Sequence, residues 1–69
     1  MIKIYLSRIL GEKRMSQAEL SRQTGIRPST IGDIYNEVAE RIKIENINKI
    51  CEVLGCTSGE LIEYIPDKK

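Results

Sequence analysis

The stretch SRQTGIRPSTIGDIYNE, residues 21–37, joins two segments of helical spacing through a tight turn. Ser21 is small where two steeply crossing helices must approach closely, and Gly25 follows where the turn needs a positive φ. Ile31 and Ile34 then place one face of the second segment against a core. Proline suits the first position of that segment, because its φ is already helical and a missing N–H costs nothing there. The stretch predicts a helix-turn-helix over about residues 17–36.

The remaining sequence predicts helices on both sides of this unit. A serine at 16 and a threonine at 57 each stand three residues before a glutamate, which is the pattern of a capping box. Glycines at 25 and 55 are expected to end the helices before them, and Pro66 to end the last one. The expected helices cover about residues 4–14, 17–23, 28–36, 44–54 and 58–65. Residues 1–5 alternate in polarity, which leaves open a short strand that pairs with a partner chain.

Apolar periodicity also predicts which side chains form the core. The expected inward positions are Leu6, Ile9, Leu10, Ala18, Leu20, Ile31, Ile34, Val38, Ile42, Ile44, Ile47, Ile50, Cys51, Leu54, Leu61, Ile62 and Ile65. Tyr35 is expected at the edge. Five short helices with tight connections indicate an all-α domain.

Length and composition exclude several classes of protein. Sixty-nine residues allow one domain, residues 1–69. No apolar run approaches ~18 residues, so no membrane span is expected. The start of the chain lacks the apolar core and cleavage site of a signal peptide, which favours the cytoplasm. The chain has no histidine and only two cysteines, Cys51 and Cys56, expected to be reduced and to fill small apolar spaces. No metal site, cofactor, small-molecule ligand or catalytic motif is evident, so an enzyme is not expected.

The net charge of +1 hides a polarised distribution. Residues 1–32 hold six basic and two acidic side chains, whereas residues 33–67 hold three basic and eight acidic ones. A basic face can therefore exist on a chain that is nearly neutral overall.

The stretches MSQAELSRQTGI, STIGDIYNE, INKICEVLG and CTSGELIEY together resemble the lambda-repressor-like family, also called Cro-type or XRE-type helix-turn-helix regulators. The resemblance covers about residues 3–65. The YNE after the second helix of the motif and a cysteine in each later stretch are similar to a subgroup of small stand-alone bacterial regulators. The resemblance implies a five-helix lambda-repressor-like domain that binds operator DNA, usually as a dimer, and regulates transcription.

The family pattern assigns expected roles by position. Base-reading candidates are Arg27, Pro28, Ser29, Thr30 and Asp33, on or beside the helix expected to enter the major groove. DNA-backbone candidates are Gln17, Arg22, Asn36, Arg41 and Lys43. Whether Arg27 contacts guanine or a phosphate is left open, and Pro28 departs from the polar residue common at its position. A plain solvated surface residue is the alternative at each of these positions.

Two carboxylates, Asp33 and Glu37, conflict with a surface for a polyanion. Asp33 can accept from cytosine N4, pair with Arg27 or Arg41, or stay out of the groove. Beside the basic half of the chain, both carboxylates are interpreted as restricting which DNA is accepted.

The function expected from these features is a sequence-specific regulator, simplest as a repressor, that binds an inverted repeat as a homodimer. Ile62, Tyr64 and Ile65 are the dimer-interface candidates. The alternative is a protein-interaction module, such as an antitoxin or anti-repressor, that keeps the fold without reading DNA. A nonspecific nucleoid or RNA binder would normally carry more net positive charge.

Overall fold

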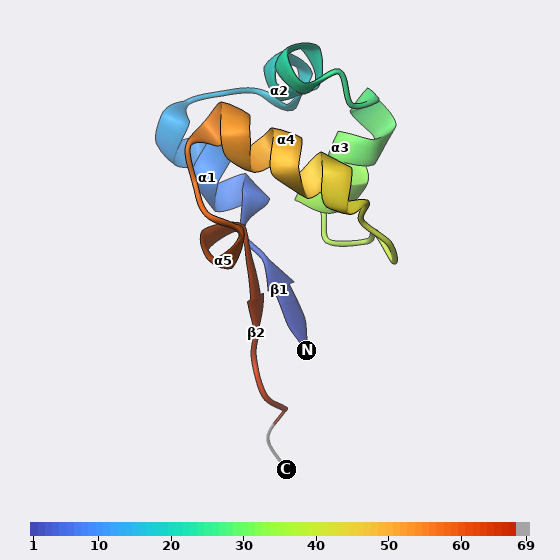
Figure 1. Cartoon of the computed structure of the whole chain (residues 1–69), viewed down its shortest axis with the longest axis vertical. Helices are drawn as coiled ribbons and strands as arrows, with labels where there is room; N and C mark the ends of the chain where they lie inside the picture. The colour runs from blue at the N-terminus through green and yellow to red at the C-terminus, as the bar shows by residue number, and fades with distance from the viewer. Residues whose placement is uncertain (68–69) are drawn as a thin grey trace.

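The computed structural model describes residues 1–67, in which five helices surround a core and two short strands extend from it (Figure 1). The elements are β1 (Ile2–Ile4), α1 (Leu6–Lys13), α2 (Gln17–Thr24), α3 (Pro28–Tyr35), α4 (Ile44–Leu54), α5 (Ser58–Leu61) and β2 (Ile62–Tyr64). Helix α4 crosses the middle of the view, with α2 and α3 at one end of the molecule and the strands at the other. None of the helices in residues 1–67 is long and apolar enough to pass through a lipid bilayer.

The helix ends follow the predicted caps. The Ser16 hydroxyl accepts the N–H of Glu19 at 3.0 Å, and Pro28 is the first residue of α3. Gly25 and Gly55 end α2 and α4 with φ of 77° and 67°, the left-handed conformation that glycine adopts without strain. The capping box is complete only at Thr57, where the Glu60 carboxylate also accepts the Thr57 N–H at 2.8 Å.

The core confirms most of the predicted inward positions. Its buried apolar side chains are Ile4, Leu6, Ile9, Leu10, Leu20, Ile26, Ile31, Ile34, Ile50, Leu54 and Leu61. Four predictions are wrong, because Ala18 is exposed, Val38 is 65 % exposed, Ile44 is 83 % exposed and Ile65 is 38 % exposed. Ala39 packs on the core from the loop that was expected to use Val38. Ile44 is the first residue of α4, and the buried residues of this helix, Ile50 and Leu54, lie in its second half.

The two strands correct the expected ends of the chain. The prediction of a fifth helix to residue 65 is wrong, because α5 ends at Leu61 and the chain continues as β2. Strand β1 pairs antiparallel with β2 of the same chain. The register places Ile2 opposite Tyr64, Lys3 opposite Glu63 and Ile4 opposite Ile62. Isoleucine and tyrosine favour a pleated strand once a neighbouring strand is available, which local periodicity does not reveal.

Candidate nucleic-acid interface

The turn between α2 and α3 is held by side-chain hydrogen bonds. The Ser21 hydroxyl donates to the carbonyl of Ile26 at 2.5 Å. The Thr24 hydroxyl donates to the carbonyl of Leu20 at 2.7 Å and accepts the N–H of Ile26 at 3.2 Å. Both hydroxyl side chains are buried, so the bonds are shielded from water. The sequence indicated Ser21 for its size alone, and the role of Thr24 was missed.

The outer face of α3 presents most of the predicted base-reading side chains. Arg27, Pro28, Ser29 and Asp33 are exposed, Thr30 is half-buried, and Ile31 and Ile34 fix the opposite face in the core. None of the ion pairs within residues 1–67 includes Asp33, so neither predicted arginine partner holds its carboxylate. The Asp33 carbonyl instead accepts the N–H groups of Val38 and Ala39, which ties the following loop to the helix.

Gln17 begins α2 and lies against α3. A Cβ atom placed on Gly32 would stand 3.5 Å from Gln17 Oε1, so the glutamine side chain lies beside the glycine in the middle of α3. This contact brings the predicted backbone-binding residue to the same surface as the predicted base readers. Sequence reasoning missed Gly32, which stands inside a helical pattern where glycine is less favourable than alanine.

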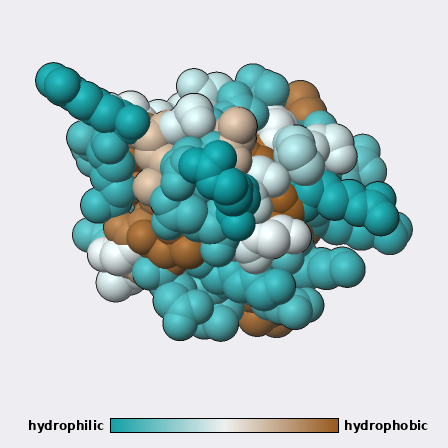
Figure 2. Space-filling view, turned by 90° about the horizontal axis from the view of Figure 1, so that it is seen from above, coloured by the Kyte–Doolittle hydropathy of each residue, from teal (hydrophilic) through white to brown (hydrophobic). Residues whose placement is uncertain are grey.

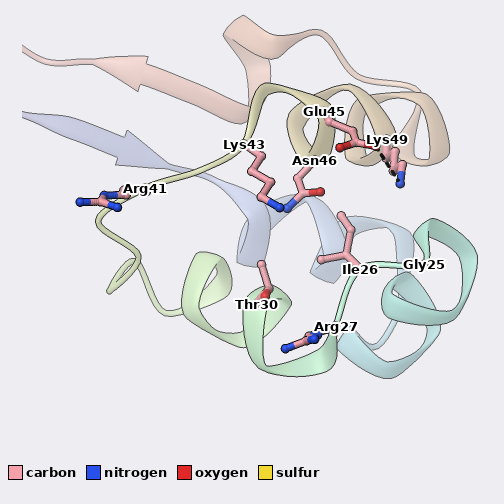
Figure 3. A pocket seen from close by; sticks show the side chains of 9 residues that line it. All are labelled: Gly25, Ile26, Arg27, Thr30, Arg41, Lys43, Glu45, Asn46 and Lys49. Carbon is pink, nitrogen blue, oxygen red and sulfur yellow. Dashed lines mark ion pairs between the residues drawn. The ribbon is translucent and has the colours of Figure 1, made fainter.

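A hollow of about 650 Å³ joins the start of α3 to the start of α4 (Figure 3). It is lined by Gly25, Ile26, Arg27, Thr30, Arg41, Lys43, Glu45, Asn46 and Lys49. Figure 3 shows the side chains of Lys43 and Asn46 directed toward Thr30, with Arg41 at the margin and directed away. The structure thus gathers Arg27, Thr30, Arg41 and Lys43, which the sequence named separately.

Asn46 and Lys49 also line this hollow and were not predicted. Both are on α4, three and six residues after Lys43, so helical spacing puts them near one face of the helix. Lys49 Nζ lies 3.6 Å from a Glu45 carboxylate oxygen. With four basic side chains and one carboxylate on its walls, the hollow is suited to an anion.

Two other predicted backbone contacts have different surroundings. Arg22 forms an ion pair with Glu19, three residues before it on α2, and Glu19 also accepts from the Gln23 amide. Arg22 must therefore exchange an intramolecular partner to reach a phosphate. Asn36 is exposed at the end of α3, where its N–H donates to the Gly32 carbonyl at 2.9 Å.

Glu37 has a structural role that corrects the interpretation of its carboxylate. One oxygen accepts the Ile4 N–H at 3.2 Å and the other accepts from Lys3 Nζ at 3.3 Å. The residue adopts φ of 59°, which turns the chain after α3 toward β1. The Ile4 N–H, followed by the Lys3 ammonium, holds the pKa of the Glu37 carboxyl below its ordinary value. The Glu37 carboxylate is thus held by Lys3 and Ile4 of the same chain, and only Asp33 of the two carboxylates remains available on the α3 surface.

The dimer-interface candidates lie on or next to β2, at the end of the molecule away from α2. Tyr64 is 64 % exposed and Ile65 38 % exposed, whereas Ile62 packs partly on the core. Met1 and Ile2, on the paired strand segment, are also largely exposed and were not predicted. The opposite end, seen over α2 in Figure 2, is mostly hydrophilic and shows apolar side chains in small separate patches.

Comparison with known proteins places this geometry in a family. Residues 5–67 match the model of the Cro/C1-type HTH DNA-binding domain. The chain is 31% identical over 67 residues to the uncharacterized HTH-type transcriptional regulator YozG of Bacillus subtilis, and the match covers 97% of this chain and 80% of that protein. A 44-residue segment is 43% identical to Transcription initiation factor IIB of Methanoregula boonei and of Methanosphaerula palustris, but it spans only 13% of those factors.

Proposed function

The chain belongs to the Cro/C1-type helix-turn-helix family of DNA-binding transcription regulators, and we propose that it is a sequence-specific repressor that places α3 in the major groove of an operator half-site. The observation that carries this proposal is the basic hollow, because it sets Lys43, Asn46 and Arg27 beside the exposed face of α3. A helix in the major groove has phosphates along both sides, and cations beside the helix neutralise them.

The assignment of roles follows from position on this surface. Ser29 and Asp33, exposed on α3, are proposed to face base edges, and Arg27 to reach either guanine or a flanking phosphate. Arg41, Lys43 and the first turn of α2 at Gln17 are proposed to hold the backbone, since a helix N-terminus supplies free N–H groups to a phosphate. The proposal assigns no catalytic step or cofactor to the chain, and it places the protein in the cytoplasm.

A single copy holds too few cations for strong binding. Each neutralised phosphate contributes about 0.9 to the slope of log affinity against log salt concentration, and one copy offers roughly three to five such contacts. We therefore propose a homodimer on an inverted repeat with half-sites about one helical turn, ~34 Å, apart. Repression would follow from occupying a promoter.

The outer half of the β1–β2 sheet is the proposed surface for the second copy. Opposed residues in an antiparallel pair direct their side chains to the same face, so Ile4 and Ile62 share a face with Ile2 and Tyr64. The inner pair packs on the core, while Ile2 and Tyr64 continue that apolar face beyond it, 57 % and 64 % exposed.

The edges of the sheet are poor alternatives to this face. The Ile4 N–H on the β1 edge already donates to Glu37. Antiparallel pairing of two β2 edges about Glu63 would bring two carboxylates directly opposite each other, which is unfavourable. A second copy is thus expected to pack on the face and not to extend the sheet.

Selection of bound sequences from a random DNA pool at two salt concentrations tests the proposal. We expect one enriched motif with two-fold symmetry and affinity that falls linearly on log–log axes as salt rises. Lys43→Ala should weaken binding to every selected sequence. The matched control is Lys13→Ala, which removes the same charge from the hollow at the other end of α4 and should weaken binding less. Failure to enrich any motif would overturn the regulator assignment. Binding to protein with no such salt dependence would favour the interaction-module alternative.

A further inference from the structure

The end of α4 brings two cysteines together through its backbone. Gly55 N–H and Cys56 N–H both donate to the carbonyl of Cys51, at 2.8 and 3.2 Å. A bond from the sixth residue back to the first, with a left-handed glycine between them, is the Schellman ending of a helix, in which the side chains of those two residues frequently contact each other. The end of α4 therefore places the Cys51 and Cys56 side chains side by side.

The distance between the two backbones suits a disulfide. The path from the Cys51 Cα through its carbonyl oxygen and the 3.2 Å hydrogen bond to Cys56 N and Cα would be about 7.4 Å long if it were straight. The trigonal carbonyl carbon and the angle at the amide nitrogen bend this path, which shortens the Cα–Cα distance toward the range of about 4.4–6.8 Å that disulfides span. Both cysteines are free and both are half-buried against the core.

The two thiols differ in access. Cys56 lines a second hollow, about 190 Å³ in volume, whose charged side chains are Arg8, Glu12, Lys13 and Glu60, whereas Cys51 is not part of its lining. Burial, followed by the adjacent Cys56 thiol, raises the pKa of the Cys51 thiol above its ordinary value. Because it lines an open hollow, Cys56 is the thiol that a reagent from solution meets first.

We propose that Cys51 and Cys56 form a reversible dithiol–disulfide site that reacts with a low-molecular-weight disulfide such as oxidised glutathione. The Cys56 thiolate attacks one sulfur of the reagent, the reagent's S–S bond breaks, and the first glutathione thiolate leaves and takes up the proton that Cys56 released. Cys51 then loses its proton and attacks the Cys56 sulfur, the mixed disulfide bond breaks, and the second glutathione thiolate leaves and takes up that proton. Two electrons pass from the cysteine pair to the reagent, which becomes two thiols.

This site is separate from the proposed DNA surface. The cysteines lie at the C-terminal end of α4 and the basic hollow lies at its N-terminal end, about 15 Å away along the helix. The inference therefore stands or falls independently of DNA binding. Oxidation links the end of α4 to the residue that precedes the α5 cap at Thr57.

The test uses the full chain, reduced and dilute, in buffers of increasing ratio of oxidised to reduced glutathione. After acid quenching and reaction with N-ethylmaleimide, intact mass should show a monomer that has lost two hydrogens and carries no maleimide, and dithiothreitol should restore both thiols. Cys51→Ser and Cys56→Ser should stop at the mixed disulfide with glutathione.

A relocated thiol pair supplies the matched control. Cys51→Ser combined with Ile47→Cys keeps two half-buried thiols but moves one by a turn of α4, away from Cys56. This variant should need a glutathione ratio higher by about tenfold or more to form an internal disulfide, because the helix ending no longer aligns its thiols. The proposal is overturned if the natural chain stops at the mixed disulfide, links two chains together, or oxidises at the same ratio as the relocated pair.

Discussion

Asp33 and Glu37 are four residues apart and carry the same charge, but their surroundings differ. The Glu37 carboxylate accepts from Ile4 and Lys3 and stabilises the join between the α3 loop and β1. No ion pair within residues 1–67 includes the Asp33 carboxylate, which stays exposed on α3. The apparent conflict between acidic residues and DNA therefore reduces to Asp33.

Asp33→Ala should change which bases are preferred, because a carboxylate in the major groove accepts from cytosine N4 and is repelled by other acceptors. The expected change is about 1–3 kcal/mol in preference at one base pair. Arg41→Ala should instead weaken binding about equally on all DNA and lower the salt slope by about one unit. Affinities for a panel of single-base operator variants measure both effects. Glu52→Ala removes the same charge elsewhere on the surface and controls for net charge. The same change in base preference in Glu52→Ala would reject the role of Asp33.

Glu37→Gln tests the brace between the α3 loop and β1 through its pH dependence. Since the pKa of Glu37 is lower in the folded chain than its ordinary 4.5, ionised Glu37 stabilises the fold above that value, and the contribution is lost as pH falls through the folded pKa. The stability difference between the natural chain and the variant should be largest near neutral pH and should close under acid. Urea unfolding from neutral to acidic pH measures it, with Glu52→Gln as the control. A difference that stays constant with pH would contradict the assignment.

For individual residues, the sequence predicted which side chains lie on the proposed DNA surface, but not the hydrogen bonds that hold the chain together. Arg27, Thr30, Arg41 and Lys43 follow from the family pattern, and the structure brings them to one hollow. The bond of Glu37 to the Ile4 N–H joins residues 33 positions apart, and no local pattern encodes such a contact. Only the pairing of β1 with β2 fixes where that N–H points.

Among the elements, the helices were predictable because their signals are local. Caps at Ser16 and Thr57, the proline at 28 and the glycines at 25 and 55 act within one turn of each helix end. The strands were not predictable in this way, because β2 pairs with a segment some sixty residues earlier in the chain. Such a pairing depends on the register between two strands, which local periodicity does not contain. Residues 62–65 therefore read as a continuing helix until β1 is considered.

Helix α3 contains a glycine whose replacement should stabilise it. Gly32→Ala should raise the free energy of unfolding by about 0.5–1 kcal/mol, because alanine loses less backbone entropy in a helix. The new Cβ would lie 3.5 Å from Gln17 Oε1, an ordinary contact, so no repacking is required. Chemical denaturation measures the change. Gly25→Ala is the contrasting variant and should destabilise, since φ there is 77°. A loss of stability in Gly32→Ala would mean that α3 and α2 approach more closely than the Gln17 contact indicates.

For the whole molecule, the apolar and basic surfaces lie apart. The basic hollow joins the α2–α3 turn to the start of α4, and the exposed apolar side chains of the sheet lie at the other end of a molecule 41 Å long. The proposed DNA surface and the proposed dimer surface can therefore be occupied at the same time. This separation is what a dimer on two half-sites requires.

Ile2→Ser combined with Tyr64→Ser tests that arrangement, since it removes the exposed cross-strand pair and leaves the inner pair Ile4–Ile62 in place. The variant should sediment as a monomer where the natural chain is a dimer. Its affinity for one half-site should be unchanged, but its affinity for the inverted repeat should fall by about 100-fold or more, because linked sites gain avidity without new contacts. Val38→Ser, an equally exposed apolar position in the loop after α3, controls for sedimentation behaviour. If the double variant remains a dimer, or if the Val38→Ser variant is a monomer to the same extent, the sheet face is not the interface.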